Sequence, residues 1–469
     1  MEKTLLWEAF GALDKTERRE FGKFVRSPFF NQKPQPIALF EYLRDCADGK
    51  TAPTSEAAWQ KIAPETAGYD DQKMRLANSE LLRLLEHFWM YREKFGDADR
   101  AKIRLAGAYR KRNLGKHFQI ALREARAARE RQPFRHAEFY HDLNLIEWEQ
   151  YQFATTDKRT GKFNLQEVSD WMDKTFIARK LRMACFALAQ QAVQQTDFRP
   201  GLLEAVLAHV EAENLADEHP AIGLYFHCFR FLTDPSAEAH FFKFREILNG
   251  HAGSFPADEL RTLFLLAINF GVKKINESKP AYLRETLGLY QDALDRGLLL
   301  ENGLLSRFAY NNIAAIALRV GEVAWAEDFT LRYKPFLEKQ HREATFSLNL
   351  ARVAYARRDF RTALENLQRA DYKDLINHLN AKVLQLKIFY ETGEFDLLDS
   401  HLSSLKTFIR RQGGTIGYHR ENYLNIVQYT RLLVAHNPND RTERLALRQR
   451  IEAEPTLTER EWFLEVLQV

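Results

Sequence analysis

The strongest concentration of charge in this sequence lies between Arg100 and Arg135. The stretch holds twelve Lys or Arg residues and two acids, Glu124 and Glu130, in a chain whose net charge is only +4. Phosphates and carboxylates are attracted to such a concentration, so its chemistry could be the binding of nucleic acid or of an acidic protein. The residues expected to form this basic patch are Arg110, Lys111, Arg112, Lys116, Arg123, Arg126 and Arg129.

Three interpretations of the basic patch stay open at this point. The aromatic residues beside the cations, Tyr109 and Phe118, are too few to stack a series of bases. The spacing of Arg123, Arg126 and Arg129 is also typical of one solvated face of a helix. The patch could therefore bind nucleic acid, bind an acidic protein surface, or simply face water.

Motifs for catalysis and for holding a cofactor are missing from the sequence. It contains no phosphate-binding loop, no nucleophile elbow and no dinucleotide fingerprint. The segment Gly413–Gly417 is rich in glycine, but no strand precedes it, so we expect a surface loop. His219 and His227 are eight residues apart, which on a helix places them some two turns apart, too far for one metal ion. We therefore expect no enzyme, no cofactor and no metal site.

Cysteine usage and hydropathy favour a soluble, cytoplasmic protein. Cys46, Cys185 and Cys228 form no Cys-x-x-Cys pair, and we expect them to be small buried residues. The start of the chain has no uninterrupted apolar segment of the kind found in signal peptides. The longest apolar stretch, 263–272, covers ten residues, whereas a membrane span needs about twenty.

The composition favours helices over sheets. Among 469 residues there are only 21 Gly and 14 Pro, too few for the many turns of a sandwich, barrel or propeller. Apolar residues recur at three- and four-residue spacing almost everywhere, as on one face of a helix. One such stripe continues from 165 to 195 without a breaker, which predicts a single helix of about thirty residues. The predicted class is all-α.

Helical segments repeat in the C-terminal half of the chain. Val323, Phe360 and Phe395 are 37 and 35 residues apart, and each follows a short Gly-Glu or Arg-Asp turn. A helix precedes each turn and a second helix begins at each of these residues. The pattern resembles the tetratricopeptide repeat, whose period is about 34 residues. Ala351 and Ala363 would take the small positions at which the paired helices cross.

The resemblance implies a right-handed α-solenoid of degenerate tetratricopeptide-like helix pairs, preceded by an N-terminal helical module. We expect the module at 1–95, the repeat array at 96–417 and C-terminal capping helices at 418–469. Segments 21–31 and 458–464 are similar to the ends of a family of uncharacterised bacterial helical-repeat proteins, which supplies no activity. Asp14–Glu17 and Thr458–Glu461 are predicted to form capping boxes.

The same resemblance points to a peptide-binding groove, because the first helix of each tetratricopeptide unit lines one. The equivalent positions here are Asn312 with Asn349, Arg352 with Lys387, and Tyr355 with Tyr390. Amides of Asn can pair with an extended peptide backbone, and Arg and Lys can bind a carboxylate. Ala315 replaces an Asn of the carboxylate clamp, which argues against a chaperone-tail ligand. Ordinary polarity of a helix surface is the alternative interpretation.

The segment Ser27–Asn31, which reads Ser-Pro-Phe-Phe-Asn, has two interpretations. It could be a recognition or modification motif. The alternative is a helix stop, because Pro28 disfavours a helical Ser27, with Phe29 and Phe30 folded back into the core.

These features favour a scaffolding or protein-interaction protein that binds a peptide or a partner helix in the solenoid groove. The first alternative is a peptide-responsive regulator, in which the repeat array controls the N-terminal module, although no clear helix-turn-helix is visible in 1–95. The second alternative is a nucleic-acid-binding protein that uses the basic patch. Each of these three interpretations predicts a different partner, and none predicts binding to a membrane.

Overall fold

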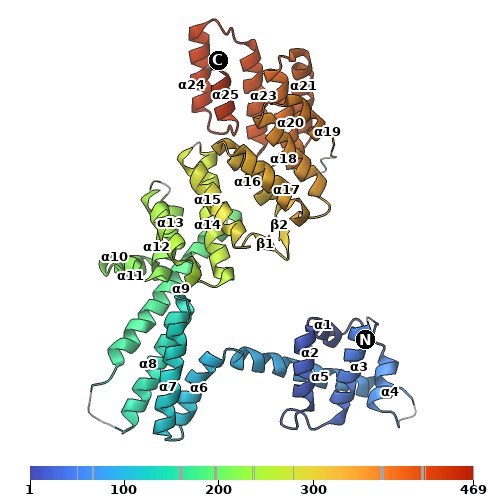
Figure 1. The fold of residues 1–469 in the computed structure, drawn as a ribbon, viewed down its shortest axis with the longest axis vertical. Helices are drawn as coiled ribbons and strands as arrows, with labels where there is room; N and C mark the ends of the chain where they lie inside the picture. The colour runs from blue at the N-terminus through green and yellow to red at the C-terminus, as the bar shows by residue number, and fades with distance from the viewer. Residues whose placement is uncertain are drawn as a thin grey trace. The chain divides into compact units, whose positions relative to one another are not determined.

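The computed structural model describes residues 1–49, 51–65, 68–157, 162–194, 198–234, 236, 238–277, 279–369, 374–412, 417 and 419–467. The glycines at 413 and 414, for which a surface loop was predicted, lie outside these residues. Helices dominate the described residues, which confirms the all-α class (Figure 1). The chain divides into two compact units, 1–133 with 137–175, and 134–136 with 176–469. The predicted divisions at 95 and 417 fall between helices, whereas the division between these units falls within a helix.

The N-terminal module, which the sequence predicts to be helical, consists of five helices in its described residues. They are α1 (Leu5–Gly11), α2 (Lys15–Arg26), α3 (Pro34–Gly49), α4 (Ser55–Ile62) and α5 (Asp71–Phe95). The predicted capping box at the start of α2 is present: Asp14 accepts the N–H of Glu17, and Glu17 accepts the N–H of Asp14. A single apolar core, which includes Phe10, Phe21 and Phe40, joins the helices of the module.

The Ser-Pro-Phe-Phe-Asn segment stops α2 as predicted, but neither of the two Phe rings is buried. The helix ends at Arg26, and Ser27 is its C-terminal cap with an extended backbone. Phe30 stacks on Phe24 with ring centroids 3.9 Å apart, whereas Phe29 is 86% exposed. The expectation that Phe29 and Phe30 fold back into the core is therefore wrong, because Phe30, itself 37% exposed, covers the buried Phe24 from the surface, and Phe29 contacts Phe30 edge to face.

Four long helices follow the module. They are α6 (Ala98–Arg110), α7 (Gly115–Arg131), α8 (Ala137–Asp157) and α9 (Leu165–Gln194). Helix α6 packs against α7 and α8, and α7 packs against α8. Helix α9 has 30 residues, which confirms the helix predicted from the unbroken apolar stripe. Among the described residues, no helix is both long and apolar enough to span a bilayer.

The next segment packs around a cluster of aromatic rings. It contains α10 (Leu203–Ala212), α11 (Leu215–Glu218), α12 (Pro220–Thr233), α13 (Glu238–His251), η1 (Ala252–Ser254), α14 (Ala257–Asn276) and α15 (Ala281–Asp295). The rings of Phe231, Phe241, Phe270 and Tyr282 contact one another edge to face or at a tilt. A two-stranded hairpin, β1 (Leu300–Glu301) with β2 (Leu304–Leu305), follows α15.

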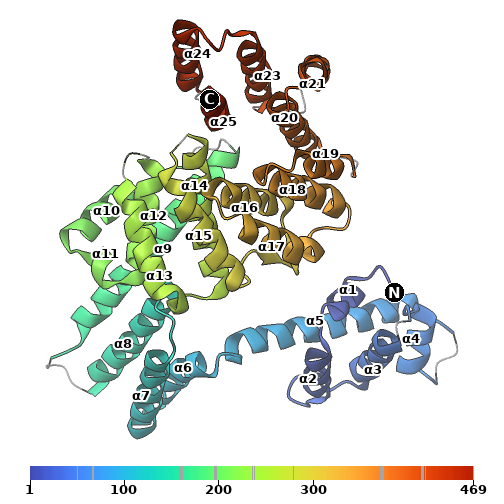
Figure 2. The same ribbon diagram turned by 45° about the horizontal axis from the view of Figure 1, so that its top comes forward.

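Three helix pairs occupy the segment in which the repeat was predicted (Figures 1 and 2). They are α16 (Arg307–Val320) with α17 (Val323–Tyr333), α18 (Arg342–Ala356) with α19 (Phe360–Gln368), and α20 (Leu375–Glu391) with α21 (Phe395–Arg411). The short helix η2 (Lys334–Phe336) follows α17. The residues predicted to start the second helices, Val323, Phe360 and Phe395, are the first residues of α17, α19 and α21.

The turns within the three pairs share one backbone conformation. Gly321, Arg358 and Gly393 each lie two residues before the second helix, with φ of 90°, 59° and 75°. A positive φ suits glycine, which has no Cβ to clash with the neighbouring carbonyl. Gly321 and Gly393 are therefore suited to closing the helices before them, whereas Arg358 adopts the same conformation with a bulky side chain.

Three C-terminal helices complete the described chain, as expected. They are α23 (His419–Ala435), α24 (Arg441–Ala453) and α25 (Arg460–Val466). Leu447, Trp462 and Phe463 share a core with residues of α20 and α21, so these helices cover the last helix pair. The capping box predicted at Thr458 does not form. The residue at the N-terminal cap of α25 is Glu459, and the N–H of Thr458 donates instead to Asn422.

Candidate peptide-binding surface

The first helices of the three pairs contact one another in succession. Helix α18 packs against both α16 and α20, and its partner α19 packs on α18. Ala351 and Ala363 are fully buried in the core between α18, α19 and α20, as expected for small residues where helices cross. Small side chains there allow the helix axes to approach closely. The three first helices therefore present their polar residues on adjoining surfaces.

A pocket of about 370 Å³ lies on this surface and contains three of the six predicted groove residues. Arg352 and Tyr355 of α18 face Lys387 of α20 across it. Helix α16 contributes Arg319, which the sequence analysis did not select. The rest of the lining is Ala315, Leu318, Ala356, Asn380, Val383, Leu384, Glu459, Glu461 and Glu465.

Acidic residues at the start of α25 meet the cations of this pocket. Lys387 Nζ lies 3.0 Å from Glu459 Oε2, and Arg319 Nη2 lies 2.6 Å from Glu461 Oε1. Burial by itself would raise the pKa of Glu459. The charges of Lys387, Arg352 and Arg319 outweigh that effect and hold the pKa below its ordinary value. The cations of this pocket thus pair with carboxylates of the same chain.

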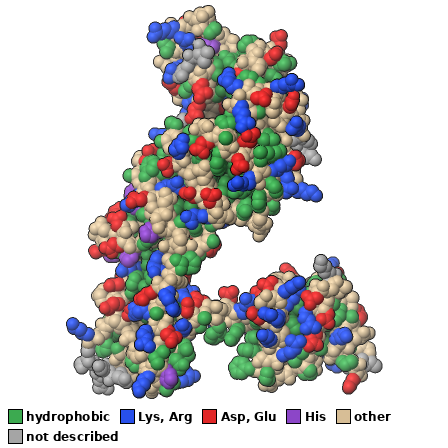
Figure 3. All heavy atoms as spheres, viewed as in Figure 1, with side chains coloured by type: hydrophobic (Ala, Val, Ile, Leu, Met, Phe, Trp, Pro, Cys, Tyr) green, Lys and Arg blue, Asp and Glu red, His purple; other side chains and the backbone are tan. Residues whose placement is uncertain are grey.

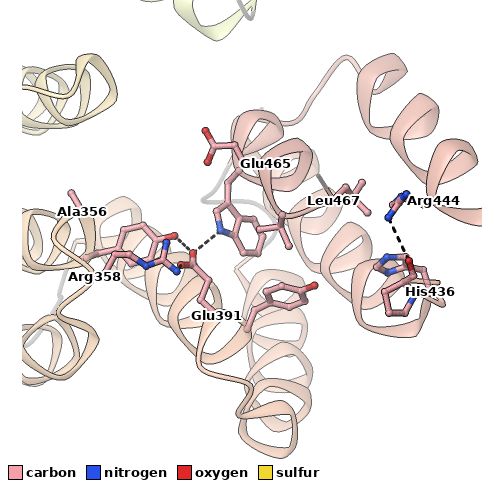
Figure 4. A pocket seen from close by; sticks show the side chains of 12 residues that line it. Ala356, Arg358, Glu391, His436, Arg444, Glu465 and Leu467 are labelled. Carbon is pink, nitrogen blue, oxygen red and sulfur yellow. Dashed lines mark hydrogen bonds and ion pairs between the residues drawn. The ribbon is translucent and has the colours of Figure 1, made fainter. Parts of the chain in front are cut away.

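A second pocket, of about 540 Å³, shares Tyr355, Ala356 and Glu465 with the first pocket (Figure 4). Its lining also includes Tyr390, Glu391 and Trp462. Glu391 accepts a hydrogen bond from the Tyr355 hydroxyl and another, of 2.9 Å, from Trp462 Nε1. Burial, reinforced by the bond to Glu391, raises the pKa of Tyr355. In Figure 4 the labelled Arg358 lies on one side of Glu391, and its guanidinium is 3.5 Å from Glu391 Oε2.

Trp462 connects the two pockets through its ring. The ring centroid lies 5.7 Å from that of Tyr390, and Lys387 Nζ lies 5.5 Å from it. Lys387 Nζ also lies 5.0 Å from the Tyr355 ring. A lysine between two aromatic rings gains cation–π attraction, which adds to its ion pair. Four predicted residues, Arg352, Tyr355, Lys387 and Tyr390, therefore line pockets together with residues of α25.

The two predicted asparagines do not join them. Asn349 is 0% exposed, and its amide donates to Asn311 Oδ1 at 2.7 Å and to the Thr345 carbonyl at 2.8 Å. Asn311 donates in turn to Asn377 Oδ1 at 2.9 Å. Asn349 is thus a member of a buried amide network that links α16, α18 and α20, and it is not open to a peptide. The expectation for Asn349 is corrected accordingly.

Asn312 faces a different neighbour from Asn349. Its side chain hydrogen-bonds to Tyr290 of α15, whose pKa burial raises to about 12. The side chain that bonds to Asn349 belongs to Asn311, one position before Asn312, and one position on a helix is a rotation of about 100°. The sequence holds both asparagines side by side, so a repeat spacing of 37 or 38 residues could not distinguish them.

Three arginines of the predicted basic patch form ion pairs with acids of α8. Arg110 Nε lies 2.8 Å from Glu149 Oε2, and Arg126 Nη2 lies 2.5 Å from Glu147 Oε1. The Arg129 side chain is only 8% exposed and pairs with the buried Asp142 at 3.0 Å. These three arginines hold α6 and α7 against α8, and they are not presented as a free cationic surface.

Asp97 extends this network at the start of α6. It caps the helix by accepting the N–H groups of Asp99 and Arg100, and it also accepts from Arg129 at 3.1 Å. Burial by itself would raise the pKa of Asp97. The hydrogen bond from the N–H of Arg100 and the charge of Arg129 outweigh burial, so the pKa lies below its ordinary value. The exposed members of the patch are Lys111, Arg112, Lys116 and Arg123.

The histidines and cysteines lie in packed surroundings. His227 Nδ1 lies 2.7 Å from His240 Nδ1, so a single proton can lie between the two rings. Burial, followed by the charge of His240, lowers the pKa of His227 to about 4. Cys46, Cys185 and Cys228 are buried thiols, as expected. Within the described part of the chain, no group of three or more metal-ligating side chains converges.

Comparison with known proteins finds no family model, no curated protein and no solved structure that matches this chain. The tetratricopeptide resemblance consequently remains an expectation from the sequence. Any function must be argued from the surface itself.

Proposed function

We propose that this chain is a protein-interaction or scaffolding protein, and that α16, α18 and α20 form the surface that binds its partner. The observation that carries the proposal is the contact with α25. A helix that begins with acidic residues and carries Trp462 lies against Arg319, Arg352 and Lys387. The chain thereby supplies an example of what this surface can hold.

The partner segment in this proposal resembles the start of α25 in its chemistry. Two carboxylates would pair with the three cations, because Arg and Lys bind carboxylates with charge-assisted hydrogen bonds. An aromatic side chain would lie against Tyr355 and Tyr390, which supply ring faces and edges. The pockets of about 370 and 540 Å³ are each large enough for side chains of a peptide or a partner helix.

The architecture in this proposal is a right-handed solenoid of tetratricopeptide-like pairs. Its support is the contact of each first helix with the next, together with the shared positive-φ turns at Gly321, Arg358 and Gly393. A cytoplasmic location and the absence of catalysis belong to the same proposal. They rest on the composition and on the lack of catalytic motifs in the sequence.

Regulation by α25 is part of the proposal, since an acidic partner must compete with Glu459 and Glu461. Weakening this internal competitor should therefore strengthen binding of an acidic probe. The probe is a labelled peptide with the sequence of residues 456–467, and a second peptide with every Glu replaced by Gln serves as its neutral counterpart.

The test measures binding of both peptides to the full chain. The double variant Glu459→Gln/Glu461→Gln should bind the acidic peptide more tightly than the wild type does. Adding Arg352→Gln and Lys387→Gln should weaken that binding by roughly tenfold or more, as expected for lost charged hydrogen bonds. Arg410→Gln, an exposed change on α21, is the control and should have no effect.

Two results would contradict the proposal. One is equal binding of the acidic and the neutral peptide, which would remove the role of the three cations. The other is acidic-peptide binding that survives the loss of Arg352 and Lys387 in a variant whose circular dichroism is unchanged.

A further inference from the structure

Outside the repeat segment, a third pocket is lined mainly by cations. It lies in the N-terminal module between α2 and α3 and has a volume of about 530 Å³. Figure 3 shows lysine and arginine side chains lying among acidic ones on the visible face of this module. The cations that line the pocket are Lys15, Arg18, Arg19, Arg26 and Arg44.

The pocket has more cations than acids to neutralise them. Asp48 is the one acid in its lining, and Arg18 Nη1 lies 3.5 Å from it. Glu41 pairs with Arg26 at 2.8 Å, and Asp45 pairs with its neighbour Arg44 at 2.9 Å. Counting five cations against these three acids leaves an excess of two positive charges.

The arginines are held in place by contacts other than ion pairs. The guanidinium of Arg26 lies 5.5 Å from the centroid of the Phe40 ring and donates to the Gly22 carbonyl at 3.0 Å. The guanidinium of Arg18 lies 5.9 Å from the centroid of the Phe10 ring. Such contacts fix the side chains before a ligand arrives, which lowers the entropy lost on binding.

One donor in the pocket has no partner in the described structure. Arg18 Nε is buried, and no oxygen among the described residues accepts a hydrogen bond from it. The contact of Arg18 Nη1 with Asp48 is long, at 3.5 Å. A buried donor of a charged group without an acceptor is costly, so an anion that accepts from it would be favoured. The arginine fork matches the oxygens of a phosphate in spacing and in planarity.

Gly22 allows the Phe40 ring and the Arg26 guanidinium to lie close against the backbone of α2. A Cβ at this position would lie 2.8 Å from Phe40 Cζ and 3.0 Å from Arg26 Nη1, so any larger residue would displace both side chains. Beside the cations the lining consists of Gly22, Phe40 and Ala47, so an organic group there would meet small and aromatic residues. The volume falls within the range typical of small-molecule sites and exceeds what a single phosphate fills.

From this geometry we propose that the N-terminal module binds a small molecule carrying a phosphate monoester. A phosphate monoester carries close to two negative charges at pH 7, which equals the excess of positive charge in the pocket. Arg18, Arg19 and Arg44 would contact the phosphate, and the organic group would occupy the remaining space next to Ala47. The proposal is independent of the peptide-binding surface, because it uses residues of α2 and α3 alone.

The experiment measures binding to the full chain by isothermal titration at low ionic strength. The probes are adenosine 5′-monophosphate and glucose 6-phosphate, with adenosine and glucose as their uncharged counterparts. A phosphotyrosine peptide forms a further arm, since it carries the same group on a macromolecule. Both small phosphates, or one of them, should bind, and the uncharged molecules should not. Binding should weaken as salt rises, because salt screens charges.

The variants separate the pocket from general charge. Arg18→Gln should weaken binding of the phosphate probe by roughly tenfold or more. Because Arg18 also packs on Phe10, the rim variant Arg19→Gln/Arg44→Gln provides a second test that leaves that packing intact. Arg75→Gln on α5 removes the same charge at a position 79% exposed and should leave binding unchanged.

Three outcomes would overturn the proposal. The first is failure of both small phosphates to bind the wild type at millimolar concentration. The second is unchanged binding in the folded rim variant. The third is binding of the phosphotyrosine peptide without binding of either small phosphate, which would assign the pocket to a macromolecular ligand.

Discussion

Glu459 Oε2 lies 3.0 Å from Lys387 Nζ, although 72 positions separate the two residues in the chain. The contact joins the start of α25 to the C-terminal part of α20, and both residues line the pocket shared with α16 and α18. The Lys387 side chain is 15% exposed and that of Glu459 is 30% exposed, so water screens the pair only in part. The position of α25 therefore depends on charge as well as on the burial of Phe463.

Replacing Glu459 with Gln should lower the free energy of unfolding by about 1–2 kcal/mol, because it leaves the partly buried Lys387 without its counter-charge. Glu452→Gln is the matched control. Glu452 pairs with Arg448 at 2.9 Å, but both side chains are more than two fifths exposed, and the expected loss is under about 0.5 kcal/mol. Urea denaturation of both variants measures the difference. Equal losses would contradict the role given to the Lys387 contact.

Asn349→Ala should destabilise the protein by about 2–4 kcal/mol. The change leaves Asn311 Oδ1 and the Thr345 carbonyl without the donor from Asn349, and it removes the acceptor, Asn349 Oδ1, of the 3.1 Å hydrogen bond from the Arg352 guanidinium. Asn312→Ala removes a bond to Tyr290 alone, and about 1 kcal/mol is expected. Thermal unfolding of the two single variants gives the comparison. A larger loss for Asn312 would show that the buried network is assigned to the wrong asparagine.

Gly393→Ala should cost about 1 kcal/mol, because its φ of 75° is unfavourable for a residue with a Cβ. Gly250→Ala isolates this effect. Neither position has an atom within 4 Å of the added Cβ, and Gly250 lies within helix α13. The Gly250 variant should be as stable as the wild type or more stable by up to about 1 kcal/mol. Melting temperatures that shift in the same direction would refute the turn geometry.

Arg129→Met should cost about 2–4 kcal/mol, because Asp142 is 1% exposed and would keep only the contact from Arg100. Arg123→Met removes the same charge from an exposed position and should change stability by less than about 0.5 kcal/mol.

The same pair of variants tests whether the basic patch binds nucleic acid. If nucleic acid binds there, Arg123→Met should weaken binding and flatten its dependence on salt.

Acid should weaken the protein through His227. Its pKa of about 4 in the folded protein lies below the ordinary value of about 6.5, so the unfolded chain binds the proton more readily between these pH values. Stability from the neutral histidine is complete above pH ~6.5 and falls as the pH drops toward ~4, by about 2 kcal/mol at pH ~5. His240, Lys243 and Asp217 also act on this group.

Urea denaturation at pH ~7 and pH ~5 measures this loss for the wild type and for His227→Gln. The variant should lose less stability than the wild type when the pH is lowered. His251→Gln, a change of an exposed histidine in the same unit, should behave like the wild type. An identical pH dependence in all three proteins would contradict the assignment to His227.

The helices could be predicted from the sequence because each depends on local information. Val323, Phe360 and Phe395 follow residues that terminate a helix, and the apolar spacing after them suits a second helix. Helix α9 was predictable because no Gly or Pro interrupts its stripe. Local pattern failed where the backbone choice depended on a distant residue. Thr458 gives its N–H to Asn422, which is 36 positions earlier.

The partners of charged side chains could not be predicted in the same way. Whether Arg110 faces water depends on the position of Glu149, which lies 39 residues later on α8. The charge count of 100–135 contains no information about that acid. Likewise Arg352 and Lys387 line one pocket, but nothing in a repeat pattern places Glu459 beside them.

The amide network of Asn311, Asn349 and Asn377 has a consequence for how the helix pairs unfold. In a simple repeat array each unit interacts with its nearest neighbours, and terminal units can open one at a time. Here Asn311 of α16 bonds directly to Asn377 of α20, so the first and third pairs are linked past the second. Opening α20 would leave buried amides unpaired in α16 and α18. We expect the amide hydrogens of α16, α18 and α20 to exchange with solvent at one common rate, as a single cooperative unit.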